Sequence, residues 1–357
     1  MNKIIEQDLN SIANDKDIDW TQIKNKTVLI TGATGLIGSI MVKAINLRNI
    51  RYNDNIKMVL LVRDKEAAQK RFLGIGNTIY IKNSIEDVDL SQVNTNIDFI
   101  IHAASPTKSE FFVKNPVETL NAVLGTKKIL DIARNKNVQS MVYLSSMEMY
   151  GTMDDRKVTE EKLGYINPLD VRSSYSEGKR MCELYSHCYC SEYGVPVKIA
   201  RLAQTFGAGI SENENRVFKY FIDCILNNED IVLKSTGSTI SNFVYTTDAI
   251  KGILTILLNG RDGEAYNIVS DNINMTILDT AKWLTETYGK GNTKVRIEIP
   301  EGQSAFAPDN RMILANDKIK ALGWKPEYDL KDGYSRLYDY LLEEREKSTV
   351  LRIDEEK

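Results

Sequence analysis

The stretch TVLITGATGLIG, residues 27–38, decides the fold. Its first five residues are apolar or β-branched and lead into a glycine, which predicts a short buried strand. Gly32, Gly35 and Gly38 follow at a spacing of three and open a helical pattern that continues to about Leu47. In such a turn one glycine permits the sharp bend, the next lets a pyrophosphate approach the backbone, and the third permits close packing of helix on sheet. Since free N–H groups at the start of the helix would face the anion, the stretch predicts a dinucleotide site rather than a plain strand–helix turn.

Apolar stretches recur along the chain after this turn, and helical patterns separate them. We expect strands within MVLLV (58–62), TIYI (78–81), IDFIIHAA (97–104), QSMVYLSS (139–146) and VPVKIARL (195–202). Strands that are apolar throughout are buried on both faces, and their alternation with helices indicates a doubly wound parallel sheet with helices on both sides. The predicted fold class is therefore α/β, with a smaller mixed α/β lobe towards the C-terminus.

We divide the chain into four parts on this pattern. They are an N-terminal extension at 1–23, a dinucleotide-binding domain at 24–205 that includes the helix after residue 174, a smaller substrate-binding lobe at 206–345 and a polar tail at 346–357. In open α/β sheets, ligands bind at the carboxyl ends of the strands. We therefore expect the site in a cleft between the two lobes.

The composition of the 357-residue chain argues against several classes of function. A net charge of −3 provides no basic field for nucleic acid, and no apolar run approaches the roughly 18 residues that a membrane span needs. The first residues, MNKIIEQDLNSIANDKDIDW, are polar and partly acidic, unlike a signal or transit peptide, so we expect a cytoplasmic protein. Four cysteines without a C-x-x-C and only two histidines argue against a metal centre, a disulfide framework and a histidine-dependent triad.

The residues that follow the second predicted strand leave the choice of dinucleotide open. An acid there holds the ribose hydroxyls of NAD, and an arginine accommodates the additional phosphate of NADP. This chain has LVRD, with Arg63 in the first position and Asp64 directly after it. Arg63 favours NADP, Asp64 is compatible with NAD, and both residue types are also common loop charges.

A tyrosine and a lysine four residues apart, in YSEGK (175–179), provide candidate catalytic groups. In a helix this spacing places Tyr175 and Lys179 on one face, about one turn apart. With 17 tyrosines in the chain, about one such pair is expected by chance, so the context decides between a catalytic pair and two exposed polar residues.

The context is the stretch YLSSMEMYG (143–151), which ends a predicted strand and brings Ser145, Ser146 and Glu148 to the same edge of the sheet. A tyrosine whose ionisation is favoured by a neighbouring ammonium group, with a serine that holds the substrate oxygen, is the arrangement that oxidises or reduces a carbinol beside nicotinamide. We therefore interpret the tyrosine, the lysine and a serine as a catalytic group.

Together these motifs resemble the extended short-chain dehydrogenase/reductase family. Within it, the chain is similar to NAD-dependent sugar-nucleotide epimerases, dehydratases and decarboxylases. The stretches that carry the resemblance are TGATGLIG (31–38), HAASP (102–106), YLSSMEMYG (143–151), YSEGKR (175–180) and LGWKPEYDLKDG (322–333). The resemblance runs from about residue 24 to residue 342 and implies a Rossmann-like domain, a nucleotide-diphosphate sugar as substrate and NAD as cofactor, with NADP as an alternative because of Arg63.

The resemblance also implies roles for individual residues. The catalytic set is Ser146, Glu148, Tyr175 and Lys179, with Tyr175 as the base that takes the proton of the sugar 4-hydroxyl. The cofactor-binding set is Gly32, Thr34, Gly35, Leu36, Ile37, Gly38, Arg63, Asp64, Ser84, Ile85, Ala103, Ala104, Ser105, Asn121, Tyr175, Lys179 and Ala203. The substrate-binding set is Gln204, Arg216 and Arg311, because arginines bind a diphosphate through paired hydrogen bonds.

The family shares its first step, the oxidation of the sugar at C4 to a 4-keto intermediate, and its branches differ in the later steps. Reduction after rotation of the sugar gives a 4-epimerase, loss of water gives a 4,6-dehydratase, and loss of carbon dioxide gives a decarboxylase. The stretches HAASPTKSEFFVKNPVETL (102–120) and NPLDVRSSYSEGKR (167–180) are most similar to UDP-glucuronate decarboxylases.

Three positions depart from the pattern of these branches. Met147 stands where dehydratases place an aspartic acid that protonates the leaving hydroxyl. Ser241 stands where decarboxylases have an arginine, and Tyr220 where they have an asparagine that contacts the base. We expect a decarboxylase, with a 4-epimerase, a 4,6-dehydratase, an NADP-dependent reductase and a non-catalytic dinucleotide sensor as alternatives.

The resemblance finally implies an assembly and a setting. Relatives dimerise through two helices per subunit, which correspond to about 116–135 and 174–193 in this chain. We therefore expect a homodimer built on a four-helix bundle, with no nucleic-acid or membrane partner. The biosynthesis of surface polysaccharide is the setting that the family implies.

Overall fold

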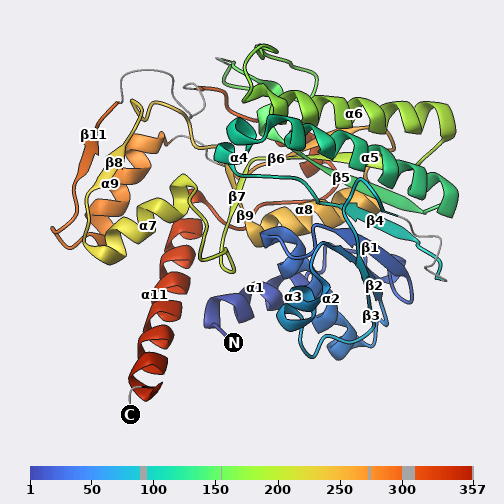
Figure 1. Cartoon of the computed structure of the whole chain (residues 1–357), viewed down its shortest axis with the longest axis horizontal. Coiled ribbons are helices and arrows are strands. Elements are labelled where there is room, and N and C mark those ends of the chain that lie inside the picture. The colour runs from blue at the N-terminus through green and yellow to red at the C-terminus, as the bar shows by residue number, and fades with distance from the viewer. Residues whose placement is uncertain (89–94, 154, 272–274, 300–309, 356–357) are drawn as a thin grey trace.

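The computed structural model describes residues 1–88, 95–153, 155–271, 275–299 and 310–355, and its centre is a seven-stranded parallel sheet (Figure 1). The strand order is β10-β6-β5-β4-β1-β2-β3. The strands are β1 (Thr27–Thr31), β2 (Lys57–Val62), β3 (Thr78–Lys82), β4 (Phe99–His102), β5 (Ser140–Ser146), β6 (Val197–Leu202) and β10 (Ala265–Ile268). The order reverses between β1 and β4, as in a doubly wound sheet, where this reversal marks the ligand-binding crevice. The predicted α/β fold class is confirmed.

Helices cover both faces of the sheet, because successive strand residues point to opposite sides. On one face Ile30, Leu60 and Val142 pack with α2 (Leu36–Tyr52) and α8 (Thr246–Asn259). On the other face Leu29, Val59 and Tyr143 pack with α5 (Pro116–Lys136) and α6 (Ser173–Tyr193). The short helices α3 (Lys65–Arg71) and α4 (Ser109–Lys114) lie in the connections after β2 and β4. Figure 1 shows α5 and α6 side by side at the outside of the molecule.

A smaller lobe lies beside one end of the sheet (Figure 1). It contains α7 (Val217–Asn227), β8 (Ile231–Leu233), α9 (Ile277–Tyr288) and β11 (Val295–Ile297), and β8 pairs with β11 in parallel. A second parallel pair, β7 (Gln204–Phe206) with β9 (Phe243–Tyr245), connects this lobe to the large sheet. The division at residue 205 stays a prediction, but α8 and β10, which fall within 206–345, pack on or join the large sheet. The chain therefore passes between the two parts more than once.

The remaining elements are three short helices and two helices near the chain termini. The short ones are η1 (Trp20–Gln22), η2 (Met147–Tyr150) and α10 (Asp317–Lys320), and the terminal ones are α1 (Lys3–Ala13) and α11 (Leu330–Glu355). Helix α11 begins against the body and continues away from it (Figure 1). Among the described residues, no helix is both long enough and apolar enough to cross a bilayer.

The N-terminal extension is an integral part of the fold rather than an appendage. Helix α1 packs against α2, α8 and α11, and its apolar residues belong to the core of the large domain. Asp8 is 1% exposed, accepts a hydrogen bond from the Tyr245 hydroxyl at 2.9 Å and pairs with Arg336 of α11 at 2.5 Å. Asp15, just after α1, pairs with Lys251 of α8 at 3.0 Å. These contacts tie the start of the chain to its last helix.

Candidate active site

Tyr175 and Lys179 lie together inside the molecule, one turn apart near the start of α6. Their residues are 8% and 5% exposed, so they are not a pair on a solvated surface. The Lys179 ammonium group donates a hydrogen bond to the Leu144 carbonyl at 2.8 Å and lies 5.6 Å from the centroid of the Tyr175 ring. The helix thus presents the phenol and the ammonium group to the carboxyl end of β5, as the spacing in YSEGK predicts.

The two serines that end β5 point to different partners. Ser146 caps η2 by accepting a hydrogen bond from the Glu148 N–H at 3.2 Å, and its side chain also hydrogen-bonds with Tyr175. Ser145 instead donates to the Glu183 carboxylate at 2.5 Å, beneath the sheet edge. Since only Ser146 contacts the tyrosine, the geometry is consistent with the assignment of the catalytic hydroxyl to Ser146 rather than to Ser145.

Burial dominates the ionisation of both central groups. It raises the pKa of the Tyr175 phenol well above its ordinary value, and the negative charge of Glu148 raises it further. The hydrogen bond from Ser146 and the charges of Arg216 and Arg172 act in the opposite direction. Burial lowers the pKa of Lys179 to about 8. In this protein alone Tyr175 is therefore a neutral phenol near pH 7, and it needs an additional positive charge beside it to become a base.

An aromatic ring covers Tyr175 from α4. Phe112 is 1% exposed and stacks on the tyrosine with 4.2 Å between ring centroids and 6° between ring planes. This stack removes one face of the phenol from water and contributes to the burial that raises its pKa. Sequence reasoning missed Phe112, although it lies within the quoted stretch 102–120.

Charged side chains surround the tyrosine in two pairs. Glu148 pairs with Arg172 at 3.1 Å, and Arg216 pairs with Glu214 at 2.7 Å. Among the described residues, the buried Nε atoms of Arg172 and Arg216 have no hydrogen-bond partner, so each arginine has a donor available for a ligand. Arg172 was not predicted, but its position three residues before Tyr175 is the spacing that brings two helical residues to one face.

The other predicted substrate contacts are less closely connected. Gln204 lies half-buried in β7, and its side-chain amide makes no hydrogen bond within the described part of the chain. Arg311 is exposed and has no contact that joins it to the charged pairs around Tyr175, although its neighbour Asn310 donates to the Gly151 carbonyl at 3.0 Å. The Tyr220 hydroxyl accepts from the Val232 N–H at 3.0 Å, which explains a tyrosine there by local structure.

The glycine-rich turn has the shape that a pyrophosphate requires. Gly32 has a φ of +66°, and a Cβ on it would lie 2.7 Å from the Ala103 backbone. A Cβ on Gly38 would lie 2.4 Å from the Gly32 carbonyl oxygen, so both positions need glycine for packing. Gly35 is different, because it is exposed and a Cβ would meet one backbone oxygen at 3.3 Å and otherwise open space. It begins a 17-residue helix that has no side-chain cap, which leaves N–H groups facing that space.

A buried hydrogen-bond network forms the floor beside this turn. The Thr31 hydroxyl accepts from the N–H groups of Ala103 and Ala104 at 3.1 and 3.0 Å, and it contacts His102 Nδ1 at 2.8 Å. The other ring nitrogen of His102 contacts Thr126 on α5 at 3.1 Å. Burial, followed by the charge of Lys179, lowers the pKa of His102 to about 3, so the ring is neutral at pH 7. The network holds the Ala103–Ala104 backbone against the glycine turn.

The comparisons with known proteins bear on this arrangement of tyrosine, lysine and glycine turn. Residues 28–269 match the model of the NAD dependent epimerase/dehydratase family. The chain belongs to this family. It is 27% identical over 334 residues to a dTDP-D-glucose 4,6-dehydratase of Bos taurus, with 89% of each chain covered. It is 28% identical over 318 residues to UDP-glucuronic acid decarboxylase 3 of Arabidopsis thaliana, with 87% of each chain covered.

A solved structure shows the same fold. The UDP-glucuronic acid 4-epimerase of Bacillus cereus, in complex with UDP-glucuronic acid and NAD, aligns with a TM-score of 0.74 at 22% identity over 89% of this chain and 99% of that one. Structural relatives within the epimerase/dehydratase family thus bind NAD. Helix α1, with its buried Asp8, lies outside the matched residues 28–269.

For this member of the epimerase/dehydratase family, the residues predicted to contact the adenosine end of the cofactor include one that is compatible with NAD and one that favours NADP. Asp64 caps α3 by accepting from the Ala67 N–H at 2.9 Å, whereas Arg63 is exposed and has no partner among the described residues. Ser84 donates to Asp87 at 2.9 Å, and Ile85 packs against Gly125. Asn121 and Ser105 are half-buried and Ala203 is buried.

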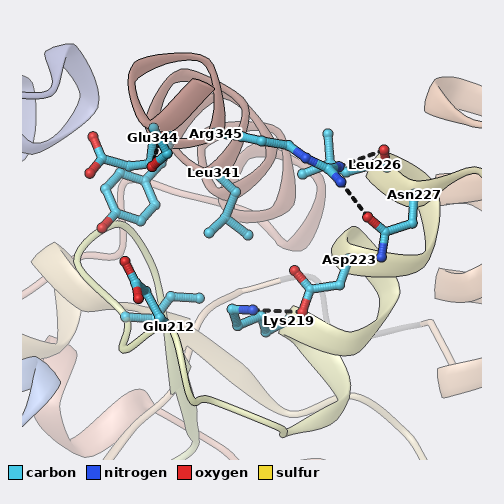
Figure 2. A pocket seen from close by; sticks show the side chains of 11 residues that line it. Glu212, Lys219, Asp223, Leu226, Asn227, Leu341, Glu344 and Arg345 are labelled. Carbon is cyan, nitrogen blue, oxygen red and sulfur yellow. Dashed lines mark hydrogen bonds and ion pairs between the residues drawn. The ribbon is translucent and has the colours of Figure 1, made fainter. Parts of the chain in front are cut away.

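Two hollows differ in their relation to these residues. A small cavity between α5 and α6 is lined by the residues Ser105, Thr119, Ala122, Tyr143, Tyr175, Gly178, Lys179 and Cys182. A wider groove lies between α7 and α11 and contains none of the predicted site residues (Figure 2). In it Lys219 pairs with Asp223 at 2.6 Å and Arg345 contacts Asn227 at 2.5 Å. The smaller hollow, not the wider one, belongs to the candidate active site. No cluster of metal-ligating side chains occurs in the described ranges.

Proposed function

We propose that this chain is an NAD-dependent decarboxylase of a nucleotide-diphosphate uronic acid, similar to UDP-glucuronate decarboxylases. Tyr175 takes the proton of the sugar 4-hydroxyl, Ser146 donates a hydrogen bond to the same oxygen, and the positive charge of Lys179 favours the tyrosinate. NAD, when bound, accepts the hydride from C4 and later returns it. The residues fit this cofactor, because Gly35 leaves open space at the uncapped start of α2, where a pyrophosphate would receive N–H groups.

The observation that carries the decarboxylase proposal over a dehydratase is the absence of a proton donor at Met147, beside the catalytic serine. Met147 is partly buried and packs against the core. Loss of water from C6 needs an acid to protonate the departing hydroxyl, which a thioether cannot supply. Loss of carbon dioxide needs none, because the bond from C5 to the carboxyl carbon breaks, its electrons pass into the C4 ketone as an enolate, and C5 is then protonated. The ketone at C4 is then reduced, which gives a pentose.

Two arginines supply the charge that such a substrate needs. We propose that Arg216 contacts the diphosphate and that Arg172 contacts the C6 carboxylate, each through the Nε donor that has no partner among the described residues. Arg172 would thereby provide the guanidinium that position 241 lacks, where the buried Ser241 hydroxyl has no partner in the described part of the chain. Gln204 and Arg311 remain candidate contacts to the sugar and its diphosphate.

Two alternatives have support from individual residues. A 4-epimerase needs neither an acid at Met147 nor an arginine at Ser241, so both departures are also compatible with epimerisation. An NADP-dependent reductase is favoured by Arg63, which is exposed and unpaired within the described part of the chain, while Asp64 is engaged as a helix cap.

We also propose that the protein is a homodimer that forms through α5 and α6. These helices and the adjoining segments expose a set of large apolar side chains, namely Val113, Val117, Leu120, Leu124, Leu169, Val171, Met181 and Leu184. Helix pairs with an exposed apolar stripe bury it against another helix pair in a bundle. A second copy of the chain provides such a pair by two-fold symmetry.

The test is mass spectrometry of the purified protein incubated with NAD and UDP-glucuronic acid, with Tyr175→Phe as the control. A product that has lost carbon dioxide supports the decarboxylase. An isomer of unchanged mass, resolved by chromatography, would replace it with a 4-epimerase. If the uronate is unchanged, UDP-, dTDP-, GDP- and CDP-hexoses are tried next, and loss of water from one of them would identify a dehydratase. Consumption of NADPH in proportion to product would identify a reductase.

A further inference from the structure

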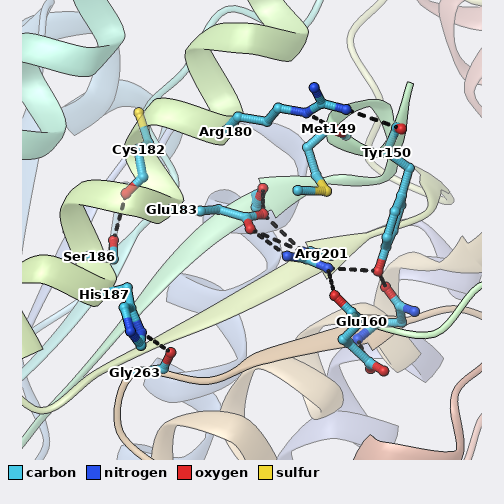
Figure 3. Close-up of polar contacts among 12 residues, drawn as sticks. Met149, Tyr150, Glu160, Arg180, Cys182, Glu183, Ser186, His187, Arg201 and Gly263 are labelled. Carbon is cyan, nitrogen blue, oxygen red and sulfur yellow. Dashed lines mark hydrogen bonds and ion pairs between the residues drawn. The ribbon is translucent and has the colours of Figure 1, made fainter. Parts of the chain in front are cut away.

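A buried ion pair, drawn in Figure 3, contacts the end of β5 through Ser145. Glu183 on α6 and Arg201 on β6 are each 7% exposed. The guanidinium of Arg201 donates from Nε to both carboxylate oxygens at 3.1 Å and from Nη2 to Oε2 at 2.7 Å. Neither residue was predicted as part of the site.

The other terminal nitrogen of Arg201 is also hydrogen-bonded. Arg201 Nη1 donates to the Tyr150 hydroxyl at 2.9 Å and to the Glu160 carbonyl at 2.7 Å. The Tyr150 hydroxyl in turn donates to the Asn267 side chain on β10 at 2.7 Å. Buried networks in which every member is paired are rigid, so this one joins α6, β6, β10 and the segment after β5 into one unit.

The pair is connected to the catalytic residues through three consecutive residues of β5. Lys179 holds the Leu144 carbonyl at 2.8 Å, Glu183 holds the Ser145 hydroxyl at 2.5 Å, and Tyr175 hydrogen-bonds with Ser146. The three helix residues are spaced four apart along α6, and therefore lie on one face. Glu183 thus makes the third contact that holds the end of β5 against the helix that carries the tyrosine and the lysine.

Glu183 also interacts electrostatically with Lys179. The titratable groups that act on the lysine or are acted on by it are Tyr175, Cys182 and Glu183 on α6, Tyr143 on β5 and His102 on β4. Glu183 is the carboxylate among these groups, and its charge raises the pKa of Lys179. Arg201 is hydrogen-bonded to that carboxylate and carries the opposite charge.

We propose that Glu183 and Arg201 act together as positioning residues for Tyr175, Ser146 and Lys179. The carboxylate holds the end of β5 in register with α6, and the guanidinium balances its charge so that Lys179 keeps its working charge state. The inference rests on the proposed role of Tyr175 as the base in the oxidation at C4, and it does not depend on which product is formed. It differs from a purely structural role because it connects the ionisation of Lys179 to a pair that touches no substrate.

The experiment observes Lys179 itself, so that it does not need turnover. Protein labelled with 13C at the lysine side chains is titrated by NMR, and the Lys179 signal is assigned by its loss in Lys179→Met. Burial lowers the pKa of Lys179 to about 8 and the charge of Glu183 raises it, so the wild-type signal is expected to titrate well below those of exposed lysines. In Glu183→Gln the lysine faces an uncompensated guanidinium, and we expect its midpoint to fall by about one pH unit, a tenfold change in the proton equilibrium.

The double variant Glu183→Gln/Arg201→Gln removes both charges and is expected to return the midpoint close to the wild-type value. Ser145→Ala keeps both charges and removes the hydrogen bond between Ser145 and Glu183. We therefore expect lower turnover with an unchanged Lys179 midpoint. If Glu183→Gln does not fold, Arg201→Gln tests the proposal instead: it leaves the Glu183 carboxylate uncompensated, so the Lys179 midpoint is expected to rise, and an unchanged midpoint would overturn the proposal. A midpoint that is the same in all three variants as in the wild type would overturn it. A double variant that titrates like the single variant would overturn the role given to Arg201. Absence of turnover in the wild type would count against the proposed function alone.

Discussion

Two ion pairs in this protein, each with a buried carboxylate, have nearly the same chemistry and different surroundings. Glu183–Arg201 joins α6 to β6, and Asp8–Arg336 joins the first helix of the chain to the last. In each pair an arginine faces a carboxylate at 2.7 or 2.5 Å, and a tyrosine hydroxyl is the third member, Tyr150 in one and Tyr245 in the other. Each arginine also lies over the ring of its tyrosine, at 5.0 and 5.6 Å from the centroid.

The difference lies in what the neighbouring residues do. The carboxylate of Glu183 is connected to Ser146, Tyr175 and Lys179 through the hydrogen bonds between α6 and β5. Asp8 contacts none of the predicted site residues. Breaking either pair leaves an uncompensated charge in the interior and lowers stability. Only the first is expected to change the chemistry of the molecules that remain folded. The comparison shows that the burial and pairing of a charge indicate how much it contributes to stability. Whether it also affects function depends on which residues the pair contacts.

The largest expected effect is on turnover, at the tyrosine that the first pair positions. Tyr175→Phe removes the proposed base, and we expect kcat to fall by about 10³-fold, in the range measured for positioned acid–base groups. The melting temperature should change little, because the ring and its stack on Phe112 remain. Tyr143→Phe is the matched control, since that phenol is also buried beside Lys179. Equal turnover in Tyr175→Phe and the wild type would contradict the catalytic assignment.

The second effect is on stability, at the terminal pair. Asp8→Asn leaves Arg336 without a charge partner, and we expect the free energy of unfolding to fall by about 3 kcal/mol, with activity per folded molecule unchanged. Urea unfolding and an active-site titration measure the two quantities. Asp17→Asn, an exposed acid just beyond the same helix, should change stability by less than about 0.5 kcal/mol. A loss of specific activity in Asp8→Asn would remove the contrast between the two pairs.

A third effect is the pH dependence of stability that comes from His102, a buried group that is neutral rather than part of an ion pair. His102 has a pKa of about 3 in the folded protein against 6.5 in an unfolded chain, so the unfolded state binds a proton first as pH falls. Stability is therefore fully present above pH 6.5 and decreases as the pH falls towards 3, by about 2 kcal/mol at pH 5. In His102→Gln this contribution disappears, and unfolding experiments at pH 7, 6 and 5 should show a shallower decline. Parallel curves for the two proteins would contradict the assignment.

The smallest expected effect on stability is at the exposed stripe of α5. Leu124→Glu changes a side chain that is 58% exposed, so the fold should be affected by less than about 0.5 kcal/mol. In a dimer built on α5 and α6 the same change buries a charge at the interface, and sedimentation should show a shift towards monomer. Leu73→Glu, which alters a leucine that is 88% exposed outside this stripe, should leave the assembly unchanged. A wild-type protein that sediments as a monomer would refute the dimer.

The parts of the fold that are local in the sequence were predictable from it. TVLIT corresponds to β1 at Thr27–Thr31, and MVLLV lies within β2 at Lys57–Val62, because strands buried on both faces are apolar throughout. The tyrosine and lysine of YSEGK share a helix face because their spacing dictates it. The place of β10 at the sheet edge was not predictable, since four residues of strand do not specify their neighbour.

The missed residues share a physical reason. Glu183 and Arg201, like Phe112 and Tyr175, lie on different elements, and pairings between elements have no fixed spacing along a chain. Helix α1 did carry a signal, because Ile5, Leu9 and Ile12 recur at helical intervals, but the polar residues between them masked an amphipathic helix whose one face is buried. The acid within it, Asp8, is the kind of residue that is buried only when a partner elsewhere in the chain pairs with it.

The contacts of Asp8 with Tyr245 and Arg336 have a consequence for the order of folding during synthesis. Asp8 leaves the ribosome early, but its partners Tyr245 and Arg336 emerge 237 and 328 residues later. Domains generally begin to fold from the N-terminal side as they emerge. Here the Asp8 carboxylate of α1 stays unpaired until α11 has been made. A nascent chain that stalls before residue 336 contains the glycine turn and the helix that carries Tyr175, but Asp8 still lacks its partner on α11, so this contact forms late in folding.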